Sequence, residues 1–201
     1  MKRHAALITG LVIAAIALHF ASFAFAQASG NWTTLFNGSS LDGWNPIGNA
    51  NWRLGDGAVQ ADQGAGFLVS RAAYGDYQLR VEFWADDDAN SGVFLRCENP
   101  QDVTAMNAYE VNIYDKRPDQ SYRTGAIVDV AKPLAQVNAG GKWNTLEITA
   151  QGSHLTVTLN GTKTVDANDS KHSRGPVALQ YGAGNNNKGV IKFRKVEIRT
   201  L

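Results

Sequence analysis

The sequence predicts an all-β protein, built as an antiparallel sandwich of two sheets of the jelly-roll type. Three observations support this fold class: apolar and polar residues alternate in many short segments, 20 of the 201 residues are glycine, and helical periodicity is nearly absent. Strands with this alternation bury one face and expose the other, as the strands of a sandwich do. The chain is long enough for one sizeable core and too short for two ordinary domains.

Residues 1–26 predict export. Lys2 and Arg3 precede a long apolar run, and the small residues Ala24 and Ala26 lie two apart at its end. This pattern is typical of a secretory signal peptide cleaved after Ala26, which would leave residues 27–201 as a single domain, either secreted or in a bacterial periplasm. Because the apolar run is long for a signal peptide, an uncleaved membrane anchor is the alternative.

The charge balance argues against nucleic acid or a membrane surface as the partner of the mature domain. The chain has 19 Lys and Arg against 18 Asp and Glu, and cleavage would remove Lys2 and Arg3. A nearly neutral domain has no electrostatic reason to bind a polyanion. Because Cys97 is the only cysteine in the sequence, the domain has no internal disulfide and depends on its core.

Strict alternation predicts strands at residues 77–84 (YQLRVEFW) and 93–96 (VFLR). The first strand places Glu82 and Trp84 together on its polar face. The second places Arg96 on the face opposite its two aliphatic residues, so this guanidinium is expected to point away from the core.

Two further patterns predict the second half of the chain. In residues 154–165, Asn160-Gly161 interrupts the alternation, and this dipeptide favours the two-residue type I′ turn of a hairpin. Residues 189–201 predict the last strand. The apolar residues there change parity, which indicates a β-bulge near Arg194 or Lys195.

Residues 108–115 (AYEVNIYD) predict a strand with two different faces. Its odd-numbered positions are apolar or aromatic, whereas Glu110, Asn112 and Tyr114 share the opposite face. A strand backbone holds a carboxylate more rigidly than a loop does, as a functional site requires. From spacing alone, a solvated strand face is the alternative.

Six segments, taken together and in order, resemble the 3-keto-disaccharide hydrolase domain family, which is often labelled a relative of glycoside hydrolase family 16. They read WTTLFNGSSLDGWNP, NSGVFLR, AYEVNIYD, RTGAI, GKWNTLEITAQGSHLTVTLNGTKTV, and GPVALQY followed by GVIKFRKVEIR, and they span nearly all of residues 32–201. The resemblance implies a concanavalin-like β-sandwich, an exported protein, and a small oligosaccharide or glycoside substrate whose sugar carries a ketone at carbon 3.

The resemblance also implies cleavage by elimination. The ketone acidifies the hydrogen on carbon 2, so a base can form an enolate that expels the group at carbon 1, after which water adds. Such a reaction needs a base, a group that stabilises the enolate oxygen, and an acid near the leaving group. Glu110 is therefore the candidate base, Arg96 its electrostatic partner and Asp115 the candidate acid. For each of the three, a purely structural or surface role is the alternative.

Polar and aromatic side chains on the predicted outer faces are candidate substrate ligands. They are Asn112, Tyr114, Glu82, Trp84 and Gln180. The Trp84 ring, standing among polar groups, could stack on a sugar, although core packing is the commoner fate of a Trp. Gln180 lies between two apolar residues of a strand and is expected to face away from the core.

Departures from the family pattern leave a second function open. Asn112 stands where Gln is common, Tyr181-Gly182 stands where a His-Gly pair is common, and the loop of residues 182–189 is longer than usual. With no clear second carboxylate, a non-catalytic, lectin-like carbohydrate-binding module is the alternative to an enzyme. A conventional family 16 glycosidase is disfavoured, because the second glutamate of its E-x-D-x-(x)-E strand is missing after Glu110.

No spacing of possible ligand residues in the sequence matches that of a known metal or cofactor site. His154 and His172 stand alone, and residues 86–97 lack the glycine and the final glutamate of an EF-hand loop. A divalent metal ion held by Glu110 and Asp115 in a sugar site is left open.

Overall fold

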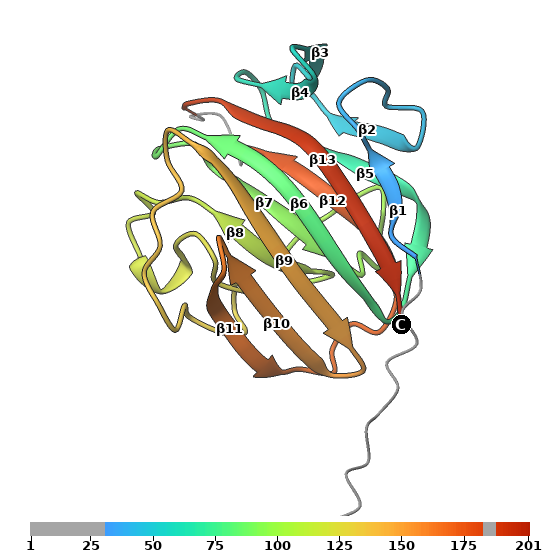
Figure 1. Ribbon diagram of the computed structural model, residues 1–201, viewed down its shortest axis with the longest axis vertical. Helices are drawn as coiled ribbons and strands as arrows, with labels where there is room; N and C mark the ends of the chain where they lie inside the picture. The colour runs from blue at the N-terminus through green and yellow to red at the C-terminus, as the bar shows by residue number, and fades with distance from the viewer. Residues whose placement is uncertain (1–30, 183–187) are drawn as a thin grey trace, which may run out of the picture.

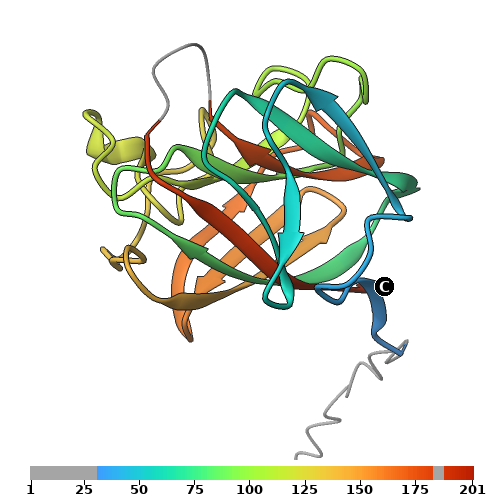
Figure 2. The same ribbon diagram turned by 90° about the horizontal axis from the view of Figure 1, so that it is seen from above.

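The computed structural model describes residues 31–182 and 188–201, which form two antiparallel sheets packed face to face (Figures 1 and 2). The predicted signal peptide lies outside the described residues, and so do residues 183–187 of the predicted long loop. The predicted all-β sandwich is confirmed. In the part of the chain that is described, no helix is long and apolar enough to cross a membrane.

The larger sheet has the strand order β11-β10-β9-β6-β13-β4-β3, and β1 pairs with β13 beside this path (Figure 1). Its strands are β1 (Thr33–Phe36), β3 (Arg53–Gly55), β4 (Ala58–Ala61), β6 (Tyr77–Ala85), β9 (Trp143–Gln151), β10 (His154–Leu159), β11 (Thr162–Asn168) and β13 (Ile191–Thr200).

The smaller sheet has the strand order β2-β5-β12-β7-β8. Its strands are β2 (Trp44–Gly48), β5 (Gly66–Tyr74), β7 (Ser91–Leu95), β8 (Tyr109–Ile113) and β12 (Gly175–Tyr181). A 3-10 turn, η1 (Gln120–Tyr122), follows β8.

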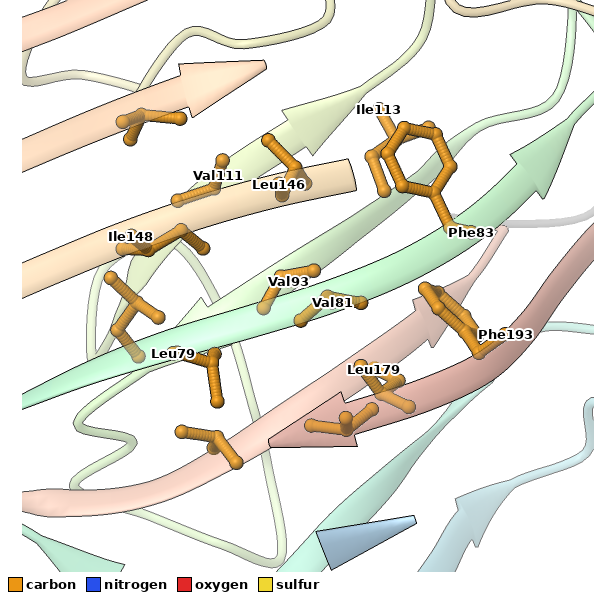
Figure 3. Close-up of a cluster of buried hydrophobic side chains, with 14 of the residues drawn as sticks. Leu79, Val81, Phe83, Val93, Val111, Ile113, Leu146, Ile148, Leu179 and Phe193 are labelled. Atoms are coloured by element: carbon orange, nitrogen blue, oxygen red, sulfur yellow. The ribbon is translucent and has the colours of Figure 1, made fainter. Parts of the chain in front are cut away.

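The core lies between the two sheets, where alternate residues of facing strands meet. Figure 3 shows Leu79, Val81 and Phe83 of β6 among side chains from β7, β8, β9, β12 and β13. Removing one such side chain from water stabilises the fold by roughly 1.5–3 kcal/mol, and this burial holds the domain together without a disulfide. Cys97 is a free, buried thiol whose pKa burial raises to about 12, so it is inert at neutral pH.

The two local predictions in the second half of the chain are confirmed. β10 and β11 pair as a hairpin, and Asn160 and Gly161 in its turn have the positive φ values, 51° and 80°, that a type I′ turn needs. The register of β13 against β6 shifts between Phe193 and Lys195, which is the predicted bulge. Both features depend on neighbouring residues alone.

The outer face of the smaller sheet carries two cross-strand rows that position the site. One row runs Glu110 (β8), Phe94 (β7), Ala178 (β12), Val69 (β5) and Asn45 (β2). The next runs Asn112 (β8), Gly92 (β7), Gln180 (β12), Phe67 (β5) and Ile47 (β2).

Candidate functional site: a pocket on the smaller sheet

A pocket of about 420 Å³ lies over these rows. Glu110, Phe94, Gln180 and Phe67 contribute to its lining from the strands, and residues 101–105 contribute from the loop between β7 and β8. A concave site of this size, with few polar groups and an apolar wall, is typical of small-molecule binding sites.

Glu110 is held rigidly by its strand. β8 pairs with β7 on one side, where Glu110 lies opposite Phe94, and on the other side the Glu110 carbonyl accepts a hydrogen bond from the Val128 amide at 3.0 Å. The backbone of this residue is therefore fixed from both directions, which holds the side chain over the pocket floor.

Glu110 is a largely buried residue whose carboxylate has no hydrogen-bond partner among the described residues. Only 8% of the residue is exposed. Burial raises the pKa of Glu110 to about 7; the charge of Arg117 opposes this shift and that of Asp129 reinforces it. A carboxyl with this pKa in a pocket is suited to accept and return a proton near neutral pH.

Gln180 converges on the same spot. It is 6% exposed, and its buried Oε1 has no hydrogen-bond partner among the described residues. A Cβ placed on Gly92 would lie 3.3 Å from Gln180 Oε1, 3.3 Å from Glu110 Cγ and 3.2 Å from Phe94 Cε2. The two polar side chains approach each other over Gly92 because this residue has no side chain of its own.

Gly92→Ala is expected to lower ligand affinity or turnover about tenfold, because the new methyl group must push Glu110 and Gln180 out of place. The measurement is titration with a sugar ligand or, for turnover, kcat/KM. Gly55→Ala is the matched control: Gly55 also lies in a strand, and nothing lies within 4 Å of its added Cβ. Equal behaviour of the two variants would show that Gly92 does not position the pocket.

Arg96 does not meet Glu110. β7 ends at Leu95, and Arg96 takes a positive φ of 53°, so the parity of the strand no longer sets its direction. Its guanidinium is buried and donates hydrogen bonds to the carbonyls of Gly75, Gly152 and His172 and to the Asp76 carboxylate, at 2.8–3.0 Å. The side chain ties three loops together, and the expectation that it pairs with Glu110 is wrong.

Asp115 does not line the pocket either. One carboxylate oxygen accepts from the Thr124 hydroxyl at 2.6 Å, and the other accepts from the Ala139 and Gly140 amides at 2.7 and 2.8 Å. These bonds fix the loops that follow β8. The structure therefore gives Asp115 a structural place and does not bring it to Glu110 as an acid or as a metal ligand.

Asn112 and Tyr114 are also outside the pocket lining. Asn112 has the predicted face, but it is 0% exposed, and its amide donates to the Tyr122 carbonyl. The Asn112 backbone amide donates to the Ala126 carbonyl, and the Asn112 carbonyl accepts from the Gly125 amide. These bonds hold the segment of residues 122–126 along the edge of β8. Tyr114 follows the end of the strand, and the Thr124 hydroxyl lies at hydrogen-bond distance from its amide, 2.9 Å.

Glu82 and Trp84 lie on the other sheet. Both belong to β6, where Arg194 donates to the Glu82 carboxylate at 2.5 Å and the Lys192 ammonium lies 5.2 Å from the centre of the Trp84 ring. They face outward from the larger sheet, on the side of the sandwich opposite the pocket. The expected platform of Trp84 beside Glu110 is not formed.

Tyr181, at the position where the family often has His, points into the core. It is fully buried, and its hydroxyl donates to the Gly189 carbonyl at 3.0 Å. Because Gln180 and Tyr181 are neighbours in one strand, they face opposite sides of the sheet. Gln180 is thus the one that lines the pocket.

Asp102 is a pocket carboxyl that the sequence patterns missed. It lies in the loop between β7 and β8, and its backbone carbonyl accepts a hydrogen bond from the Asn107 side-chain amide at 2.7 Å. Loops have no periodicity that assigns a face to each residue, so no pattern distinguishes Asp102 from other surface acids. Within residues 31–182 and 188–201, no group of three or more His, Cys, Asp or Glu side chains has the arrangement of a metal site.

Comparison with known proteins places the chain in a family. The family model described as the 3-keto-alpha-glucoside-1,2-lyase-like domain matches residues 31–199. No curated protein matches the sequence.

Solved structures share the fold. A candidate glycosyl hydrolase from Parabacteroides distasonis ATCC 8503 is 24% identical with a TM-score of 0.70, and the match covers 85% of this chain and 100% of that one. A second from the same organism is 18% identical with a TM-score of 0.72, covering 86% and 94%. The carbohydrate-binding module CBM66 from Bacillus subtilis is 18% identical with a TM-score of 0.56, covering 86% and 98%. The same sandwich therefore occurs in candidate hydrolases and in a binding module.

Proposed function

The chain belongs to the family of 3-keto-alpha-glucoside-1,2-lyase-like domains, and from this premise we propose that it is an exported enzyme that cleaves 3-keto-glycosides by elimination and hydration. The observation that carries the proposal is the Glu110 carboxyl: it lines the pocket, is nearly buried, and has a pKa of about 7. A base of this strength is ionised in part at neutral pH and basic enough to take a proton from a carbon made acidic by an adjacent ketone.

In the first step Glu110 removes the hydrogen from carbon 2, and the electron pair forms an enolate with the oxygen on carbon 3. The enolate then restores the ketone while a double bond forms between carbons 1 and 2, and the bond from carbon 1 to the leaving oxygen breaks. Water gives one proton to the leaving oxygen and adds to carbon 1 as hydroxide. The proton on Glu110 exchanges with solvent, and Glu110 then protonates carbon 2, so the net reaction is hydrolysis.

Neutral donors that line the pocket support these steps. Among the described residues that line the pocket, none is Lys or Arg, so a side-chain donor to the enolate oxygen must be neutral. Gln101, Thr104 and Gln180 are lining residues whose side chains can donate. Preorganised neutral donors in a pocket shielded from water can provide this stabilisation. Asp102, on the loop above, is a second carboxyl residue of the pocket lining, and the leaving oxygen takes its proton from water.

The pH dependence follows from the raised pKa of Glu110. The base must be ionised, so kcat/KM is expected to rise with pH, to reach half its plateau near pH 7, and to level off above. Steady-state kinetics between pH 5 and pH 9 measure this profile. A plateau that already extends below pH 6 would contradict the assignment of Glu110 as the base.

The same carboxyl links stability to pH. Because its pKa is higher in the folded chain than the ordinary value of 4.5, the folded state binds more protons between about pH 4.5 and pH 7. Its contribution to the free energy of unfolding is therefore present at low pH and is lost as pH rises through 7. In urea denaturation, this component of the pH dependence is expected to disappear in Glu110→Gln.

A direct assay tests the proposal. Purified protein is mixed with a 3-keto-disaccharide, and release of the two sugars is followed by chromatography. The proposal is supported if the wild type releases the sugars and Glu110→Gln does not. It fails if the wild type shows no turnover.

A carbohydrate-binding module is the second candidate function, favoured by the likeness to CBM66 and by the pocket's lack of a cationic side chain among its described residues. Calorimetry with saccharides distinguishes the two functions, because a module binds without forming product. Binding of intact sugar without turnover would support the module, and failure to bind any saccharide would remove it.

A further inference from the structure

The pocket changes from polar to apolar across the smaller sheet. Glu110 lies on β8 at one edge, and Gln180 lies on the central strand β12. Phe67 on β5 and Ile47 on β2 lie toward the other edge. With neighbouring strands about 4.8 Å apart, β5 is about 14 Å from β8 and β2 is about 19 Å from it. A sugar ring over Glu110 and Gln180 therefore leaves the far end of the pocket to the leaving group.

The strands at the far end contribute no side chain that can form a hydrogen bond to the pocket lining. The described lining residues from β2, β5 and the turn before β5 are Ile47, Gly48, Ala65, Gly66 and Phe67. The ring of Phe67 packs edge-on against Phe94, with centroids 5.2 Å apart and planes at 89°. Phe67 and Ile47 are half-buried and pack on a small apolar cluster beneath the pocket. The wall is thus rigid, apolar and still partly open.

We propose that this end of the pocket is a subsite for an apolar, ring-shaped leaving group, so that 3-keto-glycosides of aromatic or alicyclic alcohols are preferred over 3-keto-disaccharides. A second sugar would bring hydroxyl groups against Phe67 and Ile47, whose side chains cannot replace the bonds of these hydroxyls to water. An aromatic ring would instead bury apolar surface there, and it can pack against the Phe67 ring. This inference rests on the proposed function.

The test compares kcat/KM for the 3-keto-glucoside of benzyl alcohol with that for a 3-keto-disaccharide of glucose. Benzyl alcohol is no more acidic than a sugar hydroxyl, so leaving-group chemistry alone does not favour it. The wild type is expected to prefer the benzyl compound at least tenfold. Ile47→Thr and Phe67→Ala are expected to lower this ratio at least threefold.

Leu54→Thr is the matched control, because Leu54 is an exposed apolar strand residue of the larger sheet, away from the pocket. It should leave the ratio unchanged. Ile47→Thr keeps a β-branched, strand-compatible side chain, so its result stands even if Phe67→Ala unfolds the apolar cluster. Preference for the disaccharide in the wild type, or an equal loss for both substrates in Ile47→Thr, would overturn the inference.

A binding measurement separates this inference from the proposed function. Benzyl and methyl glucosides that lack the ketone at carbon 3, and so cannot undergo the elimination, are titrated into the wild type and Ile47→Thr. If neither 3-keto-glucoside is cleaved but the benzyl compound binds at least tenfold more tightly, and Ile47→Thr removes this difference, the subsite stands and the enzymatic proposal fails. Turnover without any preference in binding or kcat/KM leaves the enzymatic proposal standing and ends the subsite.

Discussion

Glu110→Gln is expected to lower turnover of a 3-keto-glycoside by about 10²- to 10⁴-fold while the domain stays folded. Glutamine has nearly the same shape as glutamate, so packing around Phe94 and Gly92 is kept, but its amide cannot remove the proton from carbon 2. None of the described residues donates a hydrogen bond to the carboxylate at this buried position. The folded variant with a neutral amide there should therefore be at least as stable as the wild type. Single-turnover kinetics and a urea denaturation curve measure the two effects.

Glu147→Gln provides the control. Glu147 is an exposed strand glutamate on β9 of the larger sheet, paired with Arg80 at 3.2 Å. The same chemical change there should leave turnover within twofold. If Glu110→Gln keeps more than a tenth of wild-type activity, the base is another group.

Arg96→Met is expected to lower the free energy of unfolding by about 3 kcal/mol, because it leaves buried acceptors without their donor. Arg96 is 1% exposed, and its guanidinium serves three backbone carbonyls and Asp76. Asp76 is 44% exposed, so its charge is partly solvated and contributes the smaller share. Methionine keeps the apolar stem in place. Urea denaturation monitored by Trp fluorescence gives the value.

Arg194→Met is the comparison, since Arg194 pairs with Glu82 on the outer surface of the larger sheet and is 45% exposed. Loss of this exposed pair should cost less than about 1 kcal/mol. Where Arg96→Met is folded, its kcat should equal that of the wild type. Unchanged stability together with a large loss of kcat would show that Arg96 takes part in the reaction and does not stabilise the loops that it contacts.

The fold could be predicted because its signals are local. Alternation assigns each strand residue to one face, Asn160-Gly161 specifies its own turn, and the parity change in β13 indicates the bulge. The faces of Glu110 and Gln180 follow from the same rule, and both line the pocket as expected.

The rest of the site depends on information that a strand pattern lacks. Alternation tells which face of its strand Trp84 occupies but not which sheet β6 joins. The pattern therefore cannot show that Trp84 and Glu110 lie on opposite sides of the sandwich. Parity also fails once a strand ends, as the positive φ of Arg96 shows. Gly92 did have a signal, since a glycine inside a strand often marks close approach of neighbouring groups.

In the proposed reaction, the carboxylate of Glu110 takes one proton from carbon 2 before the glycosidic bond breaks. Cleaving a 3-keto-glycoside in D₂O and examining the sugar product at early times by mass spectrometry and NMR tests this directly. One deuterium is expected at carbon 2 of the released 3-keto sugar, incorporated at the rate of cleavage by the wild type and at no more than the uncatalysed rate with Glu110→Gln. Release of a sugar that keeps its original hydrogen at carbon 2 would contradict it.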